Sequence, residues 1–393
     1  MACIYCGSDG PFSAEHVFPV GLGGNDKQWI IRDKVCATCN TDVFSRFEAR
    51  VLKSSIIAIP RMFSLGLRPR RTGKRPQRNF AFTKNSVVDT TSGRNLKIEI
   101  GRGGTPEILP QIWTDGNSYE INGKDRNEIY ALLYRVREFT DGLFSIASRA
   151  LDADERKLFQ VYGFKHQRSK LESFGAETVS SLPSEYAWLD RIEPQAKTVP
   201  SVIYMRRDRV LVGEFPSAEA YAAELITLSY STISEEIAAQ DAHSQVLENP
   251  RVSLTVSTDF RDLDRMLVKI SLNTIYHLFA VAPERLRGDV ANYVLTGDGQ
   301  YLFSPIPHNS LPSFEITARR HQHLVLIQPF AEEIAVTISL FGSFNFVGRF
   351  VLYETNPRIN AVSVIVDHES ETIEALPFDD FLLGIAQTIC NDE

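Results

Sequence analysis

Two closely spaced pairs of cysteines constrain this chain more than any other feature of its sequence. Four of its five cysteines lie in the first 39 residues, as Cys3-x2-Cys6 and Cys36-x2-Cys39, and the fifth is Cys390. The amino-terminal stretch lacks the basic and apolar regions of a secretory signal, so these pairs indicate a metal rather than disulfides. Four thiolates suit a closed tetrahedral site, and we predict structural Zn²⁺ on these cysteines.

The alternative for the cysteine pairs is redox chemistry, which favours a strand-to-helix turn in a βαβ unit; no such unit is visible here. The pattern instead predicts an extended segment at Ser13–Pro19, a glycine-rich turn and a return strand at Trp29–Ile31. A helix is predicted over Asn40–Ile57, where apolar residues recur every fourth position. So small a strand-strand-helix unit needs zinc to fold, because it lacks a core of sufficient size.

The residues between and after the cysteine pairs carry groups that can do chemistry. The full order is Cys-x2-Cys, x8, Glu15-His16-x2-Pro-x3-Gly-Gly, x11, Cys-x2-Cys-Asn40. This order resembles the HNH endonucleases of the ββα-metal superfamily. It is most similar to the branch in which two Cys-x2-Cys pairs bind structural zinc around the catalytic hairpin and helix. The resemblance covers about residues 1–57.

The resemblance implies a nuclease that hydrolyses DNA phosphodiester bonds and leaves 5′-phosphate and 3′-hydroxyl ends. It makes His16 the general base, a role that suits a group titrating near neutral pH. It makes Glu15 and Asn40 the ligands of a catalytic Mg²⁺ or Mn²⁺, which prefers oxygen ligands. Adjacent residues of a regular strand point to opposite faces, so the resemblance also implies a bend at Glu15 and His16.

Each of these residues also has a plain structural interpretation. His16 beside a zinc site can be a simple hydrogen-bond partner, and Glu15 alone can be a solvated surface acid. Asn40 before a helix is an ordinary N-cap, and this role can coexist with metal binding. The residue that orients the base stays open: Asn25 is a candidate, but turn formation explains it equally well.

Charge is distributed unevenly along the chain. The net charge is −7, yet residues 61–78 contain seven basic residues and no acidic one, while residues 81–393 carry −14. We predict that residues 61–80 form a basic linker or arm that follows DNA phosphates, the alternative being a solvated interdomain linker. The predicted DNA contacts are Arg68, Arg70, Arg71, Lys74, Arg75 and Arg78.

Length and composition indicate a globular protein of two or three domains, since the chain has 393 residues of which 43% are apolar. It contains no run of 18 apolar residues, so we expect no membrane span. We predict an α+β protein: a zinc-stapled ββα-metal nuclease unit at residues 1–60, the linker at 61–80, and a large mixed α+β domain at 81–393 with room for two subdomains.

The pattern over residues 81–393 predicts both strands and helices. Strands are predicted at 96–100, 202–204, 210–215, 252–256, 323–327, 334–340, 344–353 and 361–366. Helices are predicted at 126–138, 154–161, 218–239, 263–280 and 283–295. Lys269 and Asn273 lie one turn apart on a predicted helix and are interpreted as a surface pair, as are His321 and His323 on a predicted strand.

Three functional hypotheses follow. The leading one is a metal-dependent HNH endonuclease acting on DNA in the bacterial cytoplasm, in restriction or antiviral defence. The second is a zinc-dependent module that binds nucleic acid through a degenerate site. The third is a nuclease effector activated by a nucleotide messenger or a protein partner on residues 81–393, where the acidic domain also offers a surface for a second copy.

Overall fold

The computed structural model describes most of the chain. The described residues are 2–24, 26–64, 84–89, 93, 95–100, 105–116, 118–150, 158–167, 170–192, 200–231, 247, 250–256, 258–286, 289–306, 322–352, 359–368 and 370–383. They form two compact units. Unit 1 draws its described residues from Met1–Thr83 and Thr255–Glu393, and unit 2 draws them from Lys84–Gly101 and Thr105–Leu254. These boundaries differ from the predicted divisions at residues 60 and 80.

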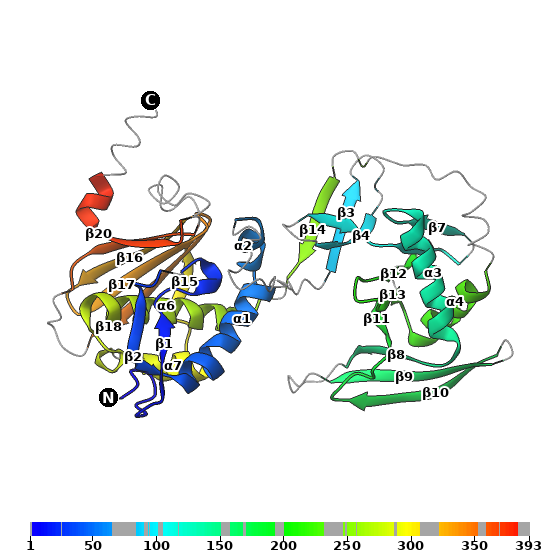
Figure 1. The fold of residues 1–393 in the computed structure, drawn as a ribbon, viewed down its shortest axis with the longest axis horizontal. Coiled ribbons are helices and arrows are strands. Elements are labelled where there is room, and N and C mark those ends of the chain that lie inside the picture. The colour runs from blue at the N-terminus through cyan, green and yellow to red at the C-terminus, as the bar shows by residue number, and fades with distance from the viewer. Residues whose placement is uncertain are drawn as a thin grey trace. The chain divides into compact units, whose positions relative to one another are not determined.

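The amino-terminal part of unit 1 has the predicted order of strand, strand and helix (Figure 1). Strand β1 (Phe12–His16) pairs antiparallel with β2 (Ile30–Cys36), and a short 3₁₀ turn, η1 (Val20–Leu22), lies between them. The helical segment begins as a π-helix, η2 (Thr38–Phe44), continues as α1 (Ser45–Ser54) and is followed by α2 (Ala58–Ser64).

The carboxy-terminal part of unit 1 is a helical segment followed by a sheet. The helical elements are α6 (Phe260–Phe279), a 3₁₀ turn η4 (Pro283–Arg285) and α7 (Val290–Thr296). The antiparallel sheet has the order β15-β18-β17-β16-β19-β20. Its strands are β15 (Phe303–Ile306), β16 (Gln322–Phe330), β17 (Glu333–Leu340), β18 (Phe344–Val351), β19 (Val362–Asp367) and β20 (Thr372–Pro377).

Helix α6 is the centre of unit 1. Its residues from Asp262 to Ile275 are all buried, which is the pattern of a helix surrounded by other elements. One hydrophobic core joins the β1–β2 hairpin and α1, through residues such as Val35 and Phe47, to α6 and to the inner face of the sheet. Figure 1 shows α6 within this assembly of β1, β2, α1 and the sheet strands. The amino-terminal segment therefore shares its core with residues that follow it by more than 200 positions.

Unit 2 is built on a mixed eight-stranded sheet of order β10-β9-β8-β11-β13-β12-β6-β7. Its strands are β6 (Gln111–Thr114), β7 (Tyr119–Asn122), β8 (Gly142–Arg149), β9 (Phe159–Gln167), β10 (Lys170–Val179), β11 (Ala187–Arg191), β12 (Ser201–Met205) and β13 (Leu211–Phe215). Strand β11 runs parallel to both of its neighbours, β8 and β13.

Two helices and a small second sheet complete unit 2. Helices α3 (Arg126–Thr140) and α4 (Ala218–Tyr230) share one core with the large sheet, and each begins at a side-chain cap, Asp125 and Ser217. The small sheet has the order β14-β3-β4-β5. Its strands are β3 (Lys84–Asp89), β4 (Asn95–Ile100), β5 (Pro106–Ile108) and β14 (Pro250–Thr255).

The structure confirms the α+β class and corrects several predicted elements. The helix predicted at 154–161 is wrong where it is described, because residues 159–161 belong to strand β9, paired with β8 and β10. The helix predicted at 283–295 is two short pieces, η4 and α7. The predicted linker begins in a helix, since residues 61–64 end α2. Within the described chain, no helix combines the length and apolar character needed to cross a membrane.

Candidate active site and metal centre

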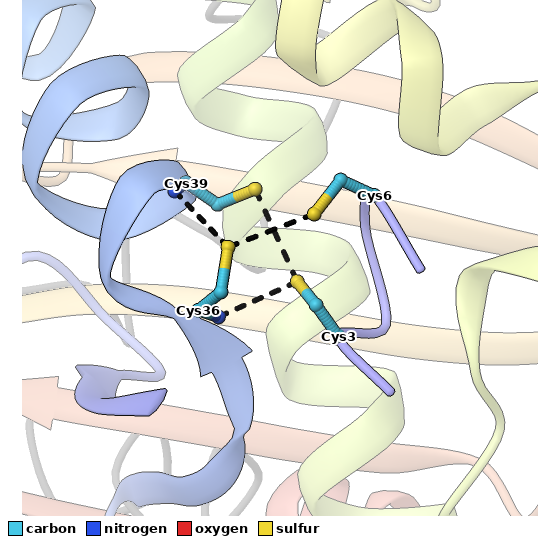
Figure 2. A group of neighbouring side chains, drawn as sticks. All are labelled: Cys3, Cys6, Cys36 and Cys39. Atoms are coloured by element: carbon cyan, nitrogen blue, oxygen red, sulfur yellow. Dashed lines mark hydrogen bonds between the residues drawn. The ribbon is translucent and has the colours of Figure 1, made fainter. Parts of the chain in front are cut away.

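The four predicted zinc ligands converge in unit 1 (Figure 2). The sulfur atoms of Cys3 and Cys39 lie 3.9 Å apart and those of Cys6 and Cys36 lie 3.6 Å apart, and all four ligand atoms lie within 4.8 Å of one another. Sulfurs at Zn–S distances of about 2.3 Å in a tetrahedron are separated by about 3.8 Å, whereas a disulfide requires about 2 Å. The cluster can therefore hold a metal ion such as zinc.

The surroundings of the cluster favour the thiolate form at some of the cysteines but not at Cys39, whose pKa is raised by burial. The backbone amides of Cys36 and Cys39 each donate a hydrogen bond of 3.4 Å to a cysteine sulfur. Burial raises the pKa of the Cys6 thiol, but hydrogen bonds from Ser8 and the other cysteines outweigh it and bring this pKa to about 6. Burial raises the pKa of Cys3, so a bound metal has to displace a proton there.

Strand β1 carries the two residues predicted to do chemistry, Glu15 and His16. The pairing of β1 with β2 shifts register between Ser13 and Glu15, whereas Glu15 and His16 pair regularly with Ile31 and Ile30, so the irregularity precedes the two residues at which the bend is predicted. The Glu15 side chain is buried, with 3% exposure of the residue, and His16 is half-buried. The interpretation of Glu15 as a solvated surface acid is therefore wrong.

Glu15 faces a buried ammonium group on helix α6. Lys269 forms ion pairs with Glu15 and with Glu48 of α1, the second at 2.5 Å, and its side chain is 2% exposed. Burial opposes the charge of Lys269, but the attraction of the two carboxylates outweighs it and raises the pKa of the ammonium. Two carboxylates share one cation, which leaves the cluster one negative charge in excess when all three groups are ionised.

Asn273, one turn further along α6, ties this cluster to strand β1. Its side-chain nitrogen donates to Glu15 Oε1 at 3.2 Å and to the His16 carbonyl at 3.3 Å. Its amide oxygen accepts a hydrogen bond of 2.7 Å from the Tyr5 hydroxyl. These bonds fix the backbone of β1 at the two candidate catalytic residues.

The His16 imidazole lies in an environment that favours its neutral form. Burial and the charge of Lys269 lower the pKa of His16, although the Glu48 carboxylate and the Gly24 backbone act in the opposite direction. The neutral imidazole is the form that accepts a proton. His16 Nδ1 is buried and makes no hydrogen bond within the described residues, so none of them orients this nitrogen.

Asn40 is positioned differently from the prediction. It lies inside η2, whose N-cap is Ala37, so the N-cap interpretation is wrong. Its amide nitrogen donates to Ser13 Oγ and to the Ala14 carbonyl, both at 3.0 Å, which joins the helical segment to β1. Both hydrogen bonds come from the side-chain nitrogen of Asn40, and neither involves its side-chain amide oxygen. In the described chain, no hydrogen bond or ion pair links Asn40 to Glu15 or His16.

The remaining predicted site residues fall outside the described residues. They are Asn25 and the basic set Arg68, Arg70, Arg71, Lys74, Arg75 and Arg78. Among the described residues, the four cysteines are the one group of three or more histidine, cysteine or acidic side chains close enough to hold a metal ion. Glu15 and His16 belong to no such group, and the amide of Asn40 is a separate candidate ligand.

Sequence reasoning missed the buried partners of the site. Lys269 and Asn273 are 2% and 0% exposed, and His323 is 0% exposed, so their interpretation as surface residues is wrong. The local pattern contains no signal of this burial. At about 100° per residue, the apolar residues at 266, 267, 268, 270 and 272 leave one side of the helix open, and Lys269 lies in the middle of that side, where a solvated residue is expected.

No protein-family model, no curated protein and no solved structure matches this chain.

Proposed function

We propose that unit 1 is a metal-dependent endonuclease that hydrolyses DNA phosphodiester bonds, with His16 as general base and the four cysteines as a structural zinc site. The observation that carries the proposal is the pair of bonds from Asn40 to Ser13 and Ala14. They bring Asn40, the residue after the fourth cysteine, against the strand that presents the half-buried imidazole of His16, whose environment favours the neutral form. This arrangement of hairpin, helix and metal cluster supports the resemblance to HNH nucleases.

The catalytic cation would bind oxygen atoms that take part in none of the hydrogen bonds and ion pairs given above. These are the Asn40 amide oxygen and the Glu15 oxygen that is not Oε1, because Lys269 and Asn273 both contact Oε1. A bound Mg²⁺ or Mn²⁺ would polarise the phosphate and stabilise the leaving oxygen. Lys269 partly neutralises Glu15, so we expect the affinity for this cation to be modest.

A second function is favoured by one observation, the Lys269 ammonium beside Glu15. A built-in cation next to a predicted metal ligand is what a degenerate site would contain. In that case the zinc unit binds nucleic acid without cleaving it. Restriction or antiviral defence, a cytoplasmic location, and a partner or a second copy on the acidic part of the chain stay predictions.

The decisive experiment measures plasmid cleavage by the full chain with Mg²⁺ and with Mn²⁺. We expect His16→Gln to reduce the cleavage rate by about 100-fold or more, the usual worth of a general base, while DNA binding persists. His166→Gln, which removes an imidazole from unit 2, is the matched control and should cleave normally. The rate should also rise with pH through a pKa below the ordinary 6.5 of histidine, since His16 must be neutral.

Two results would contradict the proposal, the first its nuclease activity and the second its general base. One is DNA binding without cleavage in any divalent ion, which supports the degenerate module. The other is cleavage that His16→Gln leaves unchanged, which removes His16 from the mechanism.

A further inference from the structure

Strand β2 contains a bulge beside the candidate active site. At the register shift between Ser13 and Glu15, residues 32–34 of β2 lie opposite Ala14 of β1 alone. The middle residue of the three, Asp33, has a φ of +56°, in the left-handed region that residues other than glycine seldom adopt. Bulges redirect the side chains of a strand and are common next to active sites. The side chains at 32–34 are therefore placed by the bulge and not by regular pairing.

The bulge presents two cations on the face of the hairpin that carries His16. Arg32 lies two residues after Ile30, the cross-strand partner of His16, and strand residues two apart share a face. The exposures agree, because Ile31 between them is buried while Arg32 is exposed. Lys34 directly precedes a residue that is buried in the core, so its side chain points to the same outer face and is half-buried there.

Neither of these cations is engaged by the protein. Within the part of the chain that the structure describes, the side chains of Arg32 and Lys34 make no hydrogen bond and no ion pair. Other arginines of unit 1 behave differently, since Arg50, Arg61 and Arg265 bind a carboxylate or backbone carbonyls. Two unengaged cations on one outer face are available to an anionic ligand.

The position of the bulge indicates which anion it serves. It faces Ala14, whose carbonyl accepts the 3.0 Å hydrogen bond from Asn40, and it adjoins His16 on the same face. Exposed cations hold a small anion poorly because water and salt screen them, whereas a polyanion that meets several cations gains from the release of its counterions. On the basis of the function proposed above, we propose that Arg32 and Lys34 bind backbone phosphates of DNA and so position the phosphodiester bond at His16.

The test measures binding of a fluorescent DNA duplex to the full chain by anisotropy over a series of salt concentrations, without added divalent ions. We expect Arg32→Ala and Lys34→Ala each to weaken binding and to make the slope of log affinity against log salt shallower by about 0.9, the effect of one lost phosphate contact. Arg32→Lys keeps the charge and should retain the slope. Arg349→Ala, which removes a 75% exposed cation of β18 that pairs with Glu333, is the matched control and should also retain it.

Cleavage kinetics with Mg²⁺ or Mn²⁺ separate this role from that of the general base. The double variant of Arg32→Ala and Lys34→Ala should raise KM for DNA and leave kcat near that of the wild type, because it loses binding that does not change in the transition state. His16→Gln should instead lower kcat and keep the affinity.

Three results would overturn the assignment of Arg32 and Lys34: no DNA binding by the wild type, an unchanged salt slope in the double variant, or a lower kcat in that variant with unchanged affinity. An unchanged slope in a protein that cleaves would reject these phosphate contacts and keep the nuclease. A shallower slope in a protein that never cleaves would support the contacts and reject the nuclease alone.

Discussion

At the scale of single residues, the Lys269 ammonium decides the stability of the candidate site. It is buried between Glu15 and Glu48, and Asn273 completes the hydrogen bonding of Glu15. A buried ion pair of this kind adds little over an apolar pair of equal volume, but removal of one partner leaves an uncompensated buried charge. The lysine is therefore a structural requirement of the site whether or not the site is catalytic.

We predict that Lys269→Ala lowers the free energy of unfolding by about 3–5 kcal/mol. Urea unfolding at pH 7 measures the effect, and Lys53→Ala, which removes an exposed lysine from α1, should leave stability nearly unchanged. Adding Glu15→Gln to Lys269→Ala should recover part of the loss, because it removes one of the stranded carboxylates. Equal stability of Lys269→Ala and the wild type would show that the two acids are protonated in the folded state.

A second residue-scale prediction concerns His323 of β16. Its Nδ1 accepts a hydrogen bond of 3.0 Å from the Phe341 amide, and its Nε2 lies 2.8 Å from the Leu22 carbonyl, so both nitrogens are engaged in the neutral ring. Burial, with a smaller contribution from the charge of His368, lowers the pKa of His323 to about 3. Between that value and the ordinary 6.5, the unfolded chain binds a proton that the folded one does not.

The contribution of neutral His323 to the free energy of unfolding is therefore fully present above about pH 6.5. It is lost as the pH falls toward 3, with a slope of up to about 1.4 kcal/mol per pH unit. Unfolding free energies of the wild type and His323→Gln across this window measure the difference. The glutamine amide can satisfy the same two backbone groups but does not titrate, so its curve should be flatter by that slope. Parallel curves would mean that His323 is not neutral in the folded protein over this pH range.

At the scale of elements, the cysteine cluster joins three pieces of chain. Cys3 and Cys6 precede β1, Cys36 ends β2, and Cys39 lies in η2. The helical segment begins without a side-chain cap at Ala37, so the cluster and the Asn40 bonds hold it to the hairpin. A metal ion bound to the four sulfurs would add a cross-link between these pieces and would couple its binding to folding.

We predict about one zinc ion per chain, measured by atomic absorption, and a clear fall in melting temperature on chelation. Cys36→Ser should lose the zinc and melt at a lower temperature, because a structural site needs all four ligands. Cys390→Ser, which alters the fifth cysteine, is the matched control and should keep its zinc. Metal-free protein with unchanged melting would contradict a structural role for the cluster.

At the scale of the whole molecule, unit 1 is held together by contacts between its amino-terminal segment and helix α6. Arg50 of α1 pairs with Asp262 of α6, Tyr5 with Asn273, and Glu48 with Lys269, while apolar residues of both segments share one core. The amino-terminal segment therefore has no hydrophobic core that is separate from the rest of unit 1.

We predict that a fragment of residues 1–60 remains largely unfolded in the presence of zinc, since it lacks α6 and the sheet that cover its apolar face. Circular dichroism and one-dimensional proton NMR of the fragment test this, with the full chain as reference. A dispersed spectrum from the fragment would show that zinc and the hairpin suffice.

The sequence alone determined the features that depend on neighbouring residues. Cysteine spacing predicted the cysteine cluster, and apolar periodicity predicted α1 and α6. Strands β8 to β11 were largely missed, because they are defined by pairing with partners distant in sequence and carry no strict alternation.

Tertiary structure alone decided which polar side chains are buried together. The sequence places Lys269 254 residues after Glu15, and no local pattern relates the two. Only the packing of α6 against the β1–β2 hairpin makes the lysine a partner of the glutamate, because burying one charge requires an opposite charge nearby.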